Sequence, residues 1–157
     1  MKANYLLIIL LYSNCLFIRS ETNSAENSPK NDHRLYNITQ SNKMKITIGS
    51  KTFTATLYDH ETAKAFKAML PLTLKMDDFN SNEKKYDLFK SLPGQSANPE
   101  TIHTGDLMLW SGHTLVLFYK TFSTQYSYVK LGHIDNPSGL AAALGAGSVT
   151  ITYDLEK

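Results

Sequence analysis

Aromatic side chains gather in one short stretch of the sequence and form its clearest candidate for a binding surface. Aromatic rings offer a large contact area at a small cost in conformational entropy, and they line many concave sites for peptides and small ligands. The same rings would equally serve to cover the wall of a β-structure, so a structural role stays open. The candidate binding residues in this stretch are Trp110, Phe118, Phe122, Tyr126 and Tyr128.

No set of side chains has the spacing of a catalytic or metal-binding centre. Glu83 has no acidic partner at a fixed spacing, so paired-carboxylate catalysis is not expected. His103, His113 and His133 lack ligand spacing to one another, which favours separate surface or hydrogen-bonded histidines over a shared metal. Ser123 lacks the motif of a nucleophile elbow. We therefore predict no catalytic residue, no metal and no cofactor.

The charge of the chain excludes one class of partner. Sixteen basic and fourteen acidic residues leave a formal net charge of +2, and both arginines, Arg19 and Arg34, precede residue 44. Nucleic-acid binding needs clustered positive charge that releases counterions, and the sequence has no basic stripe with interleaved aromatic residues. We expect a monomer with no nucleic-acid partner, which contacts a membrane only through its N-terminal segment.

The N-terminal residues have the pattern of an export signal. Lys2 precedes an apolar run from Leu6 to Leu11 that suits a secretory signal better than a membrane span, which predicts a signal segment over residues 1–20 and a periplasmic or extracellular protein. Cys15, the only cysteine, offers lipid anchoring to a bacterial membrane as an alternative, although the residues around it match a lipobox poorly. Residues 21–43 are polar without apolar periodicity and predict a disordered tether.

The remaining residues, 44–157, have the pattern of one mostly β domain. Period-two alternation on both sides of Gly49 predicts a β-hairpin, and a second hairpin near Gly112 contains a strand apolar enough to be buried on both faces. Residues 72–88 and 93–99 are expected to be irregular. The predicted strands are residues 44–48, 52–58, 106–110, 114–119, 128–134 and 149–153.

Two short helices complete the predicted domain. The first is capped by Asp59 or His60 and ends at Pro71, and the second is capped by Asn136 and ends at Gly145. Roughly seven or eight strands with two helices fit a closed barrel better than an open sheet, because closure removes exposed strand edges.

Several separated motifs resemble the bacterial cyclophilin-like domain family. They are residues 44–48, Leu70-Pro71, the polar segment 80–86, residues 101–110, and residues 128–134 followed by Gly139-Leu140. Their order and spacing resemble the family over essentially all of residues 44–156. The resemblance implies a closed cyclophilin-like β-barrel of eight strands with a helix at each end, and most members of the family have no established activity.

The resemblance also suggests that the polar segment rims the aromatic groove. This adds Asn82, Glu83 and Tyr86 to the candidate binding residues, although a solvated loop would explain the same side chains.

The chemistry of prolyl isomerisation is not preserved in the sequence. Cyclophilins present an arginine guanidinium to the prolyl nitrogen, which weakens the amide resonance that opposes rotation. No arginine follows Arg34, and a lysine is a poor replacement because it is a hydrated point charge without a planar fork. We therefore predict an exported, non-catalytic module that binds a peptide or a small ligand. The alternative is an atypical, arginine-free prolyl isomerase that uses Lys84 or His133.

Overall fold

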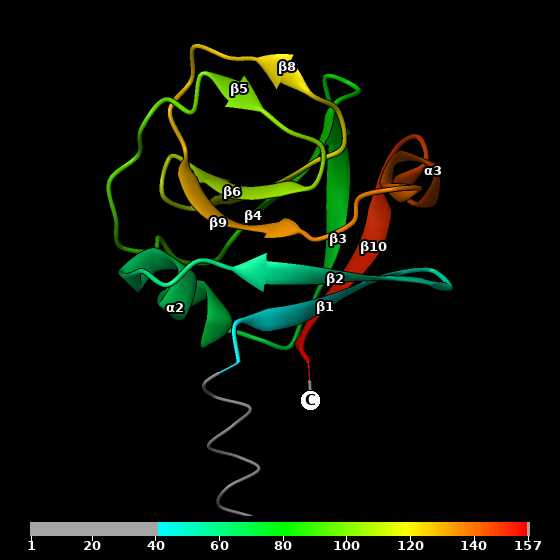
Figure 1. Ribbon diagram of the computed structural model, residues 1–157, viewed down its shortest axis with the longest axis horizontal. Helices are drawn as coiled ribbons and strands as arrows, with labels where there is room; N and C mark the ends of the chain where they lie inside the picture. The colour runs from blue at the N-terminus through cyan, green and yellow to red at the C-terminus, as the bar shows by residue number, and fades with distance from the viewer. Residues whose placement is uncertain (1–40, 157) are drawn as a thin grey trace, which may run out of the picture. The chain divides into compact units, whose positions relative to one another are not determined.

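Eight antiparallel strands close into a barrel in the computed structural model, which describes residues 41–156 (Figure 1). The strands are β1 (Lys43–Ile48), β2 (Lys51–Leu57), β3 (Leu72–Phe79), β4 (Glu83–Asp87), β6 (Asp106–Trp110), β7 (Thr114–Phe118), β9 (Val129–Ile134) and β10 (Val149–Leu155). They pair around the barrel in the order β1-β10-β3-β4-β7-β6-β9-β2. This closed barrel confirms the predicted fold class.

The N-terminal predictions fall mostly outside the described residues. The signal segment 1–20, Cys15 and residues 21–40 of the tether all lie there. Lys43, which we had assigned to the tether, is the first residue of β1.

The interior of the barrel is filled by every second residue of its strands. In β1, Met44, Ile46 and Ile48 are buried, whereas Lys45 between them is exposed. This alternation follows from the two-residue period of a strand, which directs successive side chains to opposite faces. Burying each such apolar side chain is worth about 1.5–3 kcal/mol relative to leaving it in water.

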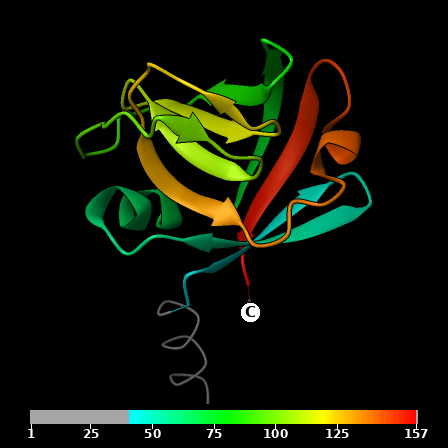
Figure 2. The same cartoon turned by 45° about the horizontal axis from the view of Figure 1, so that its top comes forward.

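Two helices pack against the barrel core from opposite sides (Figure 2). They are α2 (Glu61–Lys67), which contributes Phe66, and α3 (Leu140–Leu144), whose two terminal leucines are buried. The Nδ1 atom of His60 accepts a hydrogen bond from the Ala63 N–H at 3.3 Å, so His60 is the cap of α2 as predicted. Neither described helix is long and apolar enough to cross a membrane.

The predicted cap of α3 was wrong. The Asn136 side chain accepts a hydrogen bond from the Ser138 N–H at 3.1 Å and so closes a turn ahead of the helix. The N-cap position belongs to Gly139, whose φ of 81° lies in the left-handed region. The helix therefore begins later than the position of Asn136 suggested, and it ends at Gly145 as predicted.

The prediction of an irregular segment over residues 72–88 was also wrong, because β3 and β4 form a hairpin there. Its turn is made by Asn80 and Ser81, whose φ values of 52° and 53° give the left-handed backbone that tight hairpin turns require. The Asn82 N–H closes the turn by donating to the Phe79 carbonyl at 3.3 Å. Residues 72–76 of β3 do alternate between apolar and polar, and the prediction overlooked this pattern, whereas the charged residues of β4 leave no such alternation to read.

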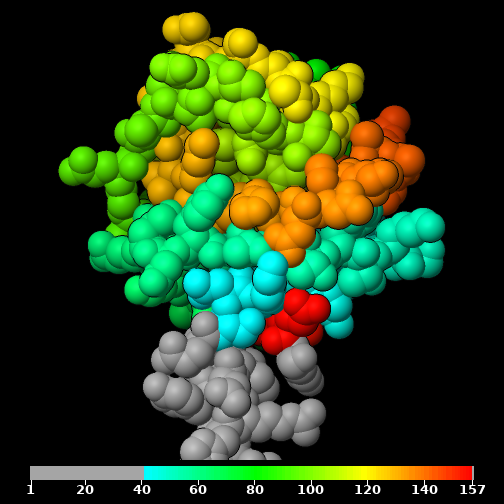
Figure 3. All heavy atoms as spheres, in the orientation of Figure 1, coloured from blue at the N-terminus to red at the C-terminus, as the bar shows by residue number. Residues whose placement is uncertain are grey.

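A small second sheet covers the outer face of the barrel wall at β6 and β7. It consists of β5 (Thr101–Ile102) and β8 (Phe122–Ser123), whose neighbouring segments form one continuous surface at the top of the space-filling view (Figure 3). Beneath it lies a second apolar cluster, and β7 is buried along its whole length, as predicted. The buried members of this outer cluster are Ile102, Met108, Val116, Phe118 and Tyr128.

Candidate functional site

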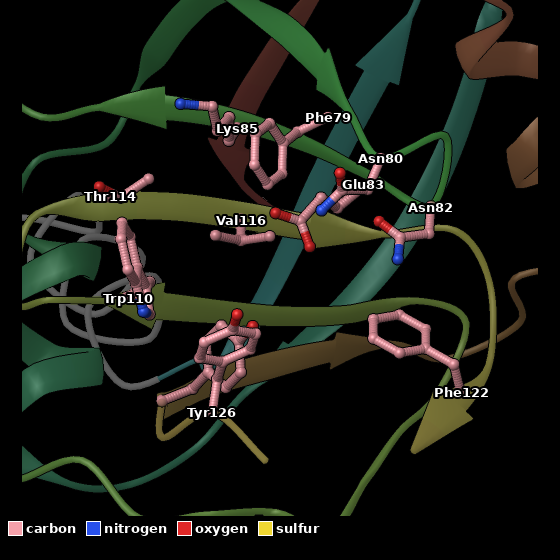
Figure 4. Close-up of a pocket in the computed structure, with 11 residues that line it drawn as sticks. Phe79, Asn80, Asn82, Glu83, Lys85, Trp110, Thr114, Val116, Phe122 and Tyr126 are labelled. Atoms are coloured by element: carbon pink, nitrogen blue, oxygen red, sulfur yellow. The ribbon is translucent and has the colours of Figure 1, made fainter. Parts of the chain in front are cut away.

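A pocket of about 250 Å³ opens on the outer face of the barrel wall, beside the outer cluster (Figure 4). It lies over β4, β7 and β6, and the segment that follows β8 supplies further walls. Its aromatic lining is Phe79, Trp110, Phe122, Tyr126 and Tyr128. Its other lining residues are Asn80, Asn82, Glu83, Lys85, Thr114 and Val116.

Strand register directs Glu83 into this pocket. In the β4–β7 ladder Glu83 lies opposite Phe118, and Lys85 lies opposite Val116. Phe118 and Val116 belong to the outer cluster, so Glu83 and Lys85 also point outward, whereas Lys84 between them points to the barrel interior. In Figure 4 the Glu83 side chain lies between Phe79 and Tyr126, with Val116 and Asn82 on either side.

The Glu83 carboxylate is buried without a partner. The residue is 8% exposed, and no hydrogen bond or ion pair joins its carboxylate to any other residue that the structure describes. Burial raises the pKa of this carboxyl from 4.5 to about 7. The positive charge of Lys85 lowers this pKa, and the negative charge of Asp78 raises it further. Glu83 can therefore change its charge near neutral pH.

Lys85, the cation that lines the pocket, is directed away from Glu83. Its Nζ atom lies 5.2 Å from the centroid of the Phe79 ring, and Figure 4 shows it pointing away from the carboxylate. Asn82 carries a second unsatisfied group, because its buried Oδ1 atom has no hydrogen-bond partner. The hydroxyl of Thr114 is already engaged, since it donates to Asp87 at 2.6 Å.

The structure brings together most of the residues that we predicted to bind a ligand. Phe118 does not reach the pocket, because it lies beneath it with ring centroids 5.8 Å from Phe122 and 5.5 Å from Tyr128. Tyr86 also does not line it, because it shares the inward face of β4 with Lys84. The predicted residues that do line the pocket are Asn82, Glu83, Trp110, Phe122, Tyr126 and Tyr128.

Several lining residues were absent from our predicted set. Phe79 and Lys85 come from the hairpin that we had expected to be irregular, whereas Asn80 lies in the polar segment that we expected to rim the groove. Recognition of that hairpin would have placed Lys85 on the same face as Glu83, since the two are separated by one residue. Thr114 and Val116 were assigned to a strand but not to a site.

The two residues named for an alternative isomerase lie outside the pocket. The Nζ atom of Lys84 is buried and donates to Asp78 at 2.8 Å, to the Gly145 carbonyl at 2.9 Å and to the Gly147 carbonyl at 2.6 Å. His133 instead packs beside Tyr58, with ring centroids 5.8 Å apart. Within residues 41–156, no three histidine, cysteine or acidic side chains come together as metal ligands.

Tyr126 and Tyr128 are expected to differ sharply in their effect on stability. Tyr126 is 67% exposed, whereas Tyr128 is 8% exposed. The ring of Tyr128 also packs edge-on against the ring of Phe118. Tyr128→Ala should therefore lower the free energy of unfolding by about 3 kcal/mol, whereas Tyr126→Ala should leave it nearly unchanged. Urea denaturation of both variants measures this, and equal losses would contradict the assigned burial.

Comparison with known proteins adds a family and a structural neighbour. A family model described as "Cyclophilin-like family" matches residues 46–154. The solution structure of a hypothetical protein from Archaeoglobus fulgidus is similar, with a TM-score of 0.57 and 18% sequence identity over 74% of this chain and 95% of that chain. At that identity the neighbour shows the fold alone. No curated protein sequence matches the chain.

Proposed function

Because the chain belongs to the cyclophilin-like family, we propose that its barrel is a non-catalytic module that binds a peptide side chain or a small ligand in the pocket around Glu83. The observation that supports this most strongly is the pocket itself, with aromatic walls around one buried carboxylate. Such a mostly apolar cavity with few polar groups is the usual form of a binding site.

The polar groups of the pocket favour binding over isomerisation. Rotation of an X-Pro bond is assisted by a planar donor held against the prolyl nitrogen, and no arginine follows Arg34 in the sequence. The lining cation, Lys85, rests over the Phe79 ring. Lys84 is held by three oxygen atoms on the opposite face of β4.

Export is part of the proposal. It is supported by the apolar run from Leu6 to Leu11 behind Lys2. Lipid attachment at Cys15 is the alternative. Intact-mass measurement of the protein recovered from its host distinguishes cleavage, lipid attachment and retention of the segment.

Trp110, the only tryptophan, makes the proposed binding directly measurable. Screening the purified chain against short peptides and small fragments should reveal ligands that change its fluorescence, and Tyr126→Ala should weaken their binding about tenfold or more without unfolding the protein. The proposal would be contradicted if the screen found no ligand, or if Tyr126→Ala left the affinity of the ligands unchanged.

A protease-coupled assay on a proline tetrapeptide tests the proposed lack of catalysis. The purified chain should leave the cis–trans exchange at its uncatalysed rate, because no guanidinium is available to the prolyl nitrogen. Acceleration at rates typical of cyclophilins would overturn this part of the proposal and make the pocket an active site.

A further inference from the structure

The unsatisfied polar atoms that line the pocket are hydrogen-bond acceptors. They are the Glu83 carboxylate oxygens, on a residue that is 8% exposed, and the fully buried Oδ1 atom of Asn82, and neither group receives a hydrogen bond within the part of the chain that the structure describes. Because burial limits their contact with water, a ligand that supplies N–H donors at Glu83 would recover part of the free energy lost on burial. The missing component of the pocket is therefore a donor, and a charged donor would satisfy Glu83 best.

The aromatic walls favour the same kind of ligand. A ring face attracts a cation through its quadrupole, and tryptophan does so most strongly. The pocket already contains one such contact, because the Lys85 ammonium lies 5.2 Å from the centroid of the Phe79 ring. Trp110, Tyr126 and Phe122 line the rest of the pocket around Glu83 (Figure 4). A ligand paired with the Glu83 carboxylate would therefore also lie in a pocket with aromatic walls.

We propose, resting on the binding role argued above, that this pocket takes an organic cation: an ammonium group carried on an alkyl chain. The ammonium would pair with Glu83, beside Asn82, and the alkyl chain would lie against the aromatic rings. Lysine side chains, methylated lysine side chains and free alkylamines share this chemistry. A bound metal ion fits less well, because hard cations require more oxygen ligands than one carboxylate and its neighbouring amides supply.

The charges around Glu83 give the proposed binding a definite dependence on pH. Asp78 and Lys85 act on Glu83 from β3 and β4, and Glu83 in turn acts on Tyr119 and Tyr128. Both tyrosines have raised pKa values, so near neutral pH they remain uncharged. The titrating group of the pocket is then Glu83, and the preference for a cation should grow as the pH rises through about 7.

Four matched probes test the inference on the purified full chain. They are capped lysine, capped Nε-trimethyl-lysine, capped Nε-acetyl-lysine and capped norleucine, which differ mainly in the charge at the end of a similar stem. Trp110 fluorescence should give an affinity for at least one of the two cations about tenfold or more above that for both neutral probes at about pH 8. The relative affinity of the two cations distinguishes a primary from a quaternary ammonium ligand.

Glu83→Gln should abolish the preference for cations while leaving the neutral probes as weak as before. Glu61→Gln serves as the control, because this exposed residue of α2 does not line the pocket and should preserve the preference. Neutral probes that bind as well as the cations would overturn this inference and leave the proposed binding function intact. Failure of all four probes would also overturn it, and the broader ligand screen then decides whether the binding function itself fails.

Discussion

Replacement of Lys84 by methionine is expected to lower the free energy of unfolding by about 3 kcal/mol, the lower end of the cost of breaking a buried charge pair, because Asp78 is itself 21% exposed. Lys84 is completely buried, and its ammonium donates to Asp78, Gly145 and Gly147. Methionine fills a similar volume but donates nothing, so it would leave two carbonyls and one carboxylate without this donor. Tyr119 would still donate to Asp78 at 2.7 Å.

Lys85→Met provides the matched control, one residue further along the same strand. Lys85 points outward and its ammonium contacts the Phe79 ring rather than buried oxygen atoms. Its removal should change the free energy of unfolding by less than about 1 kcal/mol. Chemical denaturation compares the two variants, and similar losses would show that Lys84 does not hold β4 to the segment after α3.

Glu83→Gln is expected to make the protein more stable than the wild type at alkaline pH. The pKa of Glu83 is raised in the folded protein from 4.5 to about 7, mainly by burial. Between these values the folded state binds more protons than the unfolded state, so wild-type stability falls as pH rises and the penalty is complete above about 7. At 1.36 kcal/mol per pKa unit, the full difference is about 3 kcal/mol.

The measurement is the free energy of unfolding of both proteins from about pH 4 to pH 9, a range that spans the expected pKa change. The advantage of Glu83→Gln should grow with pH through the interval where wild-type Glu83 loses its proton. Acids that do not interact with Glu83, such as Asp135, whose pKa is lowered mainly by its hydrogen bond from Lys43, act equally on both proteins and cancel in the difference. Parallel curves would mean that Glu83 is hydrated like an ordinary surface carboxylate.

The barrel could be predicted from the sequence where strands alternate cleanly or form continuous apolar runs. The hairpin around Gly49 was found because its strands alternate, and the hairpin around Gly112 was found because apolar strands flank a glycine turn. The β3–β4 hairpin was missed because β4 buries a lysine on its inner face and a glutamate on its outer face. Hydrophobicity assigns both residues to solvent, whereas the contacts of Lys84 with Asp78 and with two distant glycine carbonyls explain why it is buried.

Only part of the candidate site could be predicted from the sequence. The aromatic residues from Trp110 onward were recognisable because they are concentrated in one stretch, but their separation into the pocket and the layer beneath it depends on β8 folding over β7. Tyr86 and Lys85 are adjacent in sequence, and strand register alone decides that Lys85 lines the pocket. Register is a tertiary property, so composition could not assign these two residues.

Direct titration of the Glu83 carboxyl by NMR, with and without a saturating Nε-trimethyl-lysine or lysine probe, tests the central claim most directly. We predict a midpoint near 7 for the free protein, because the carboxyl is buried without a partner. We also predict that saturation with the preferred cation lowers this midpoint by about one pH unit. By linkage, such a shift corresponds to a cation that binds the ionised site about tenfold more tightly than the protonated site. A midpoint near 4.5, the value of an unperturbed glutamate, or one that neither cation moves, would contradict the account.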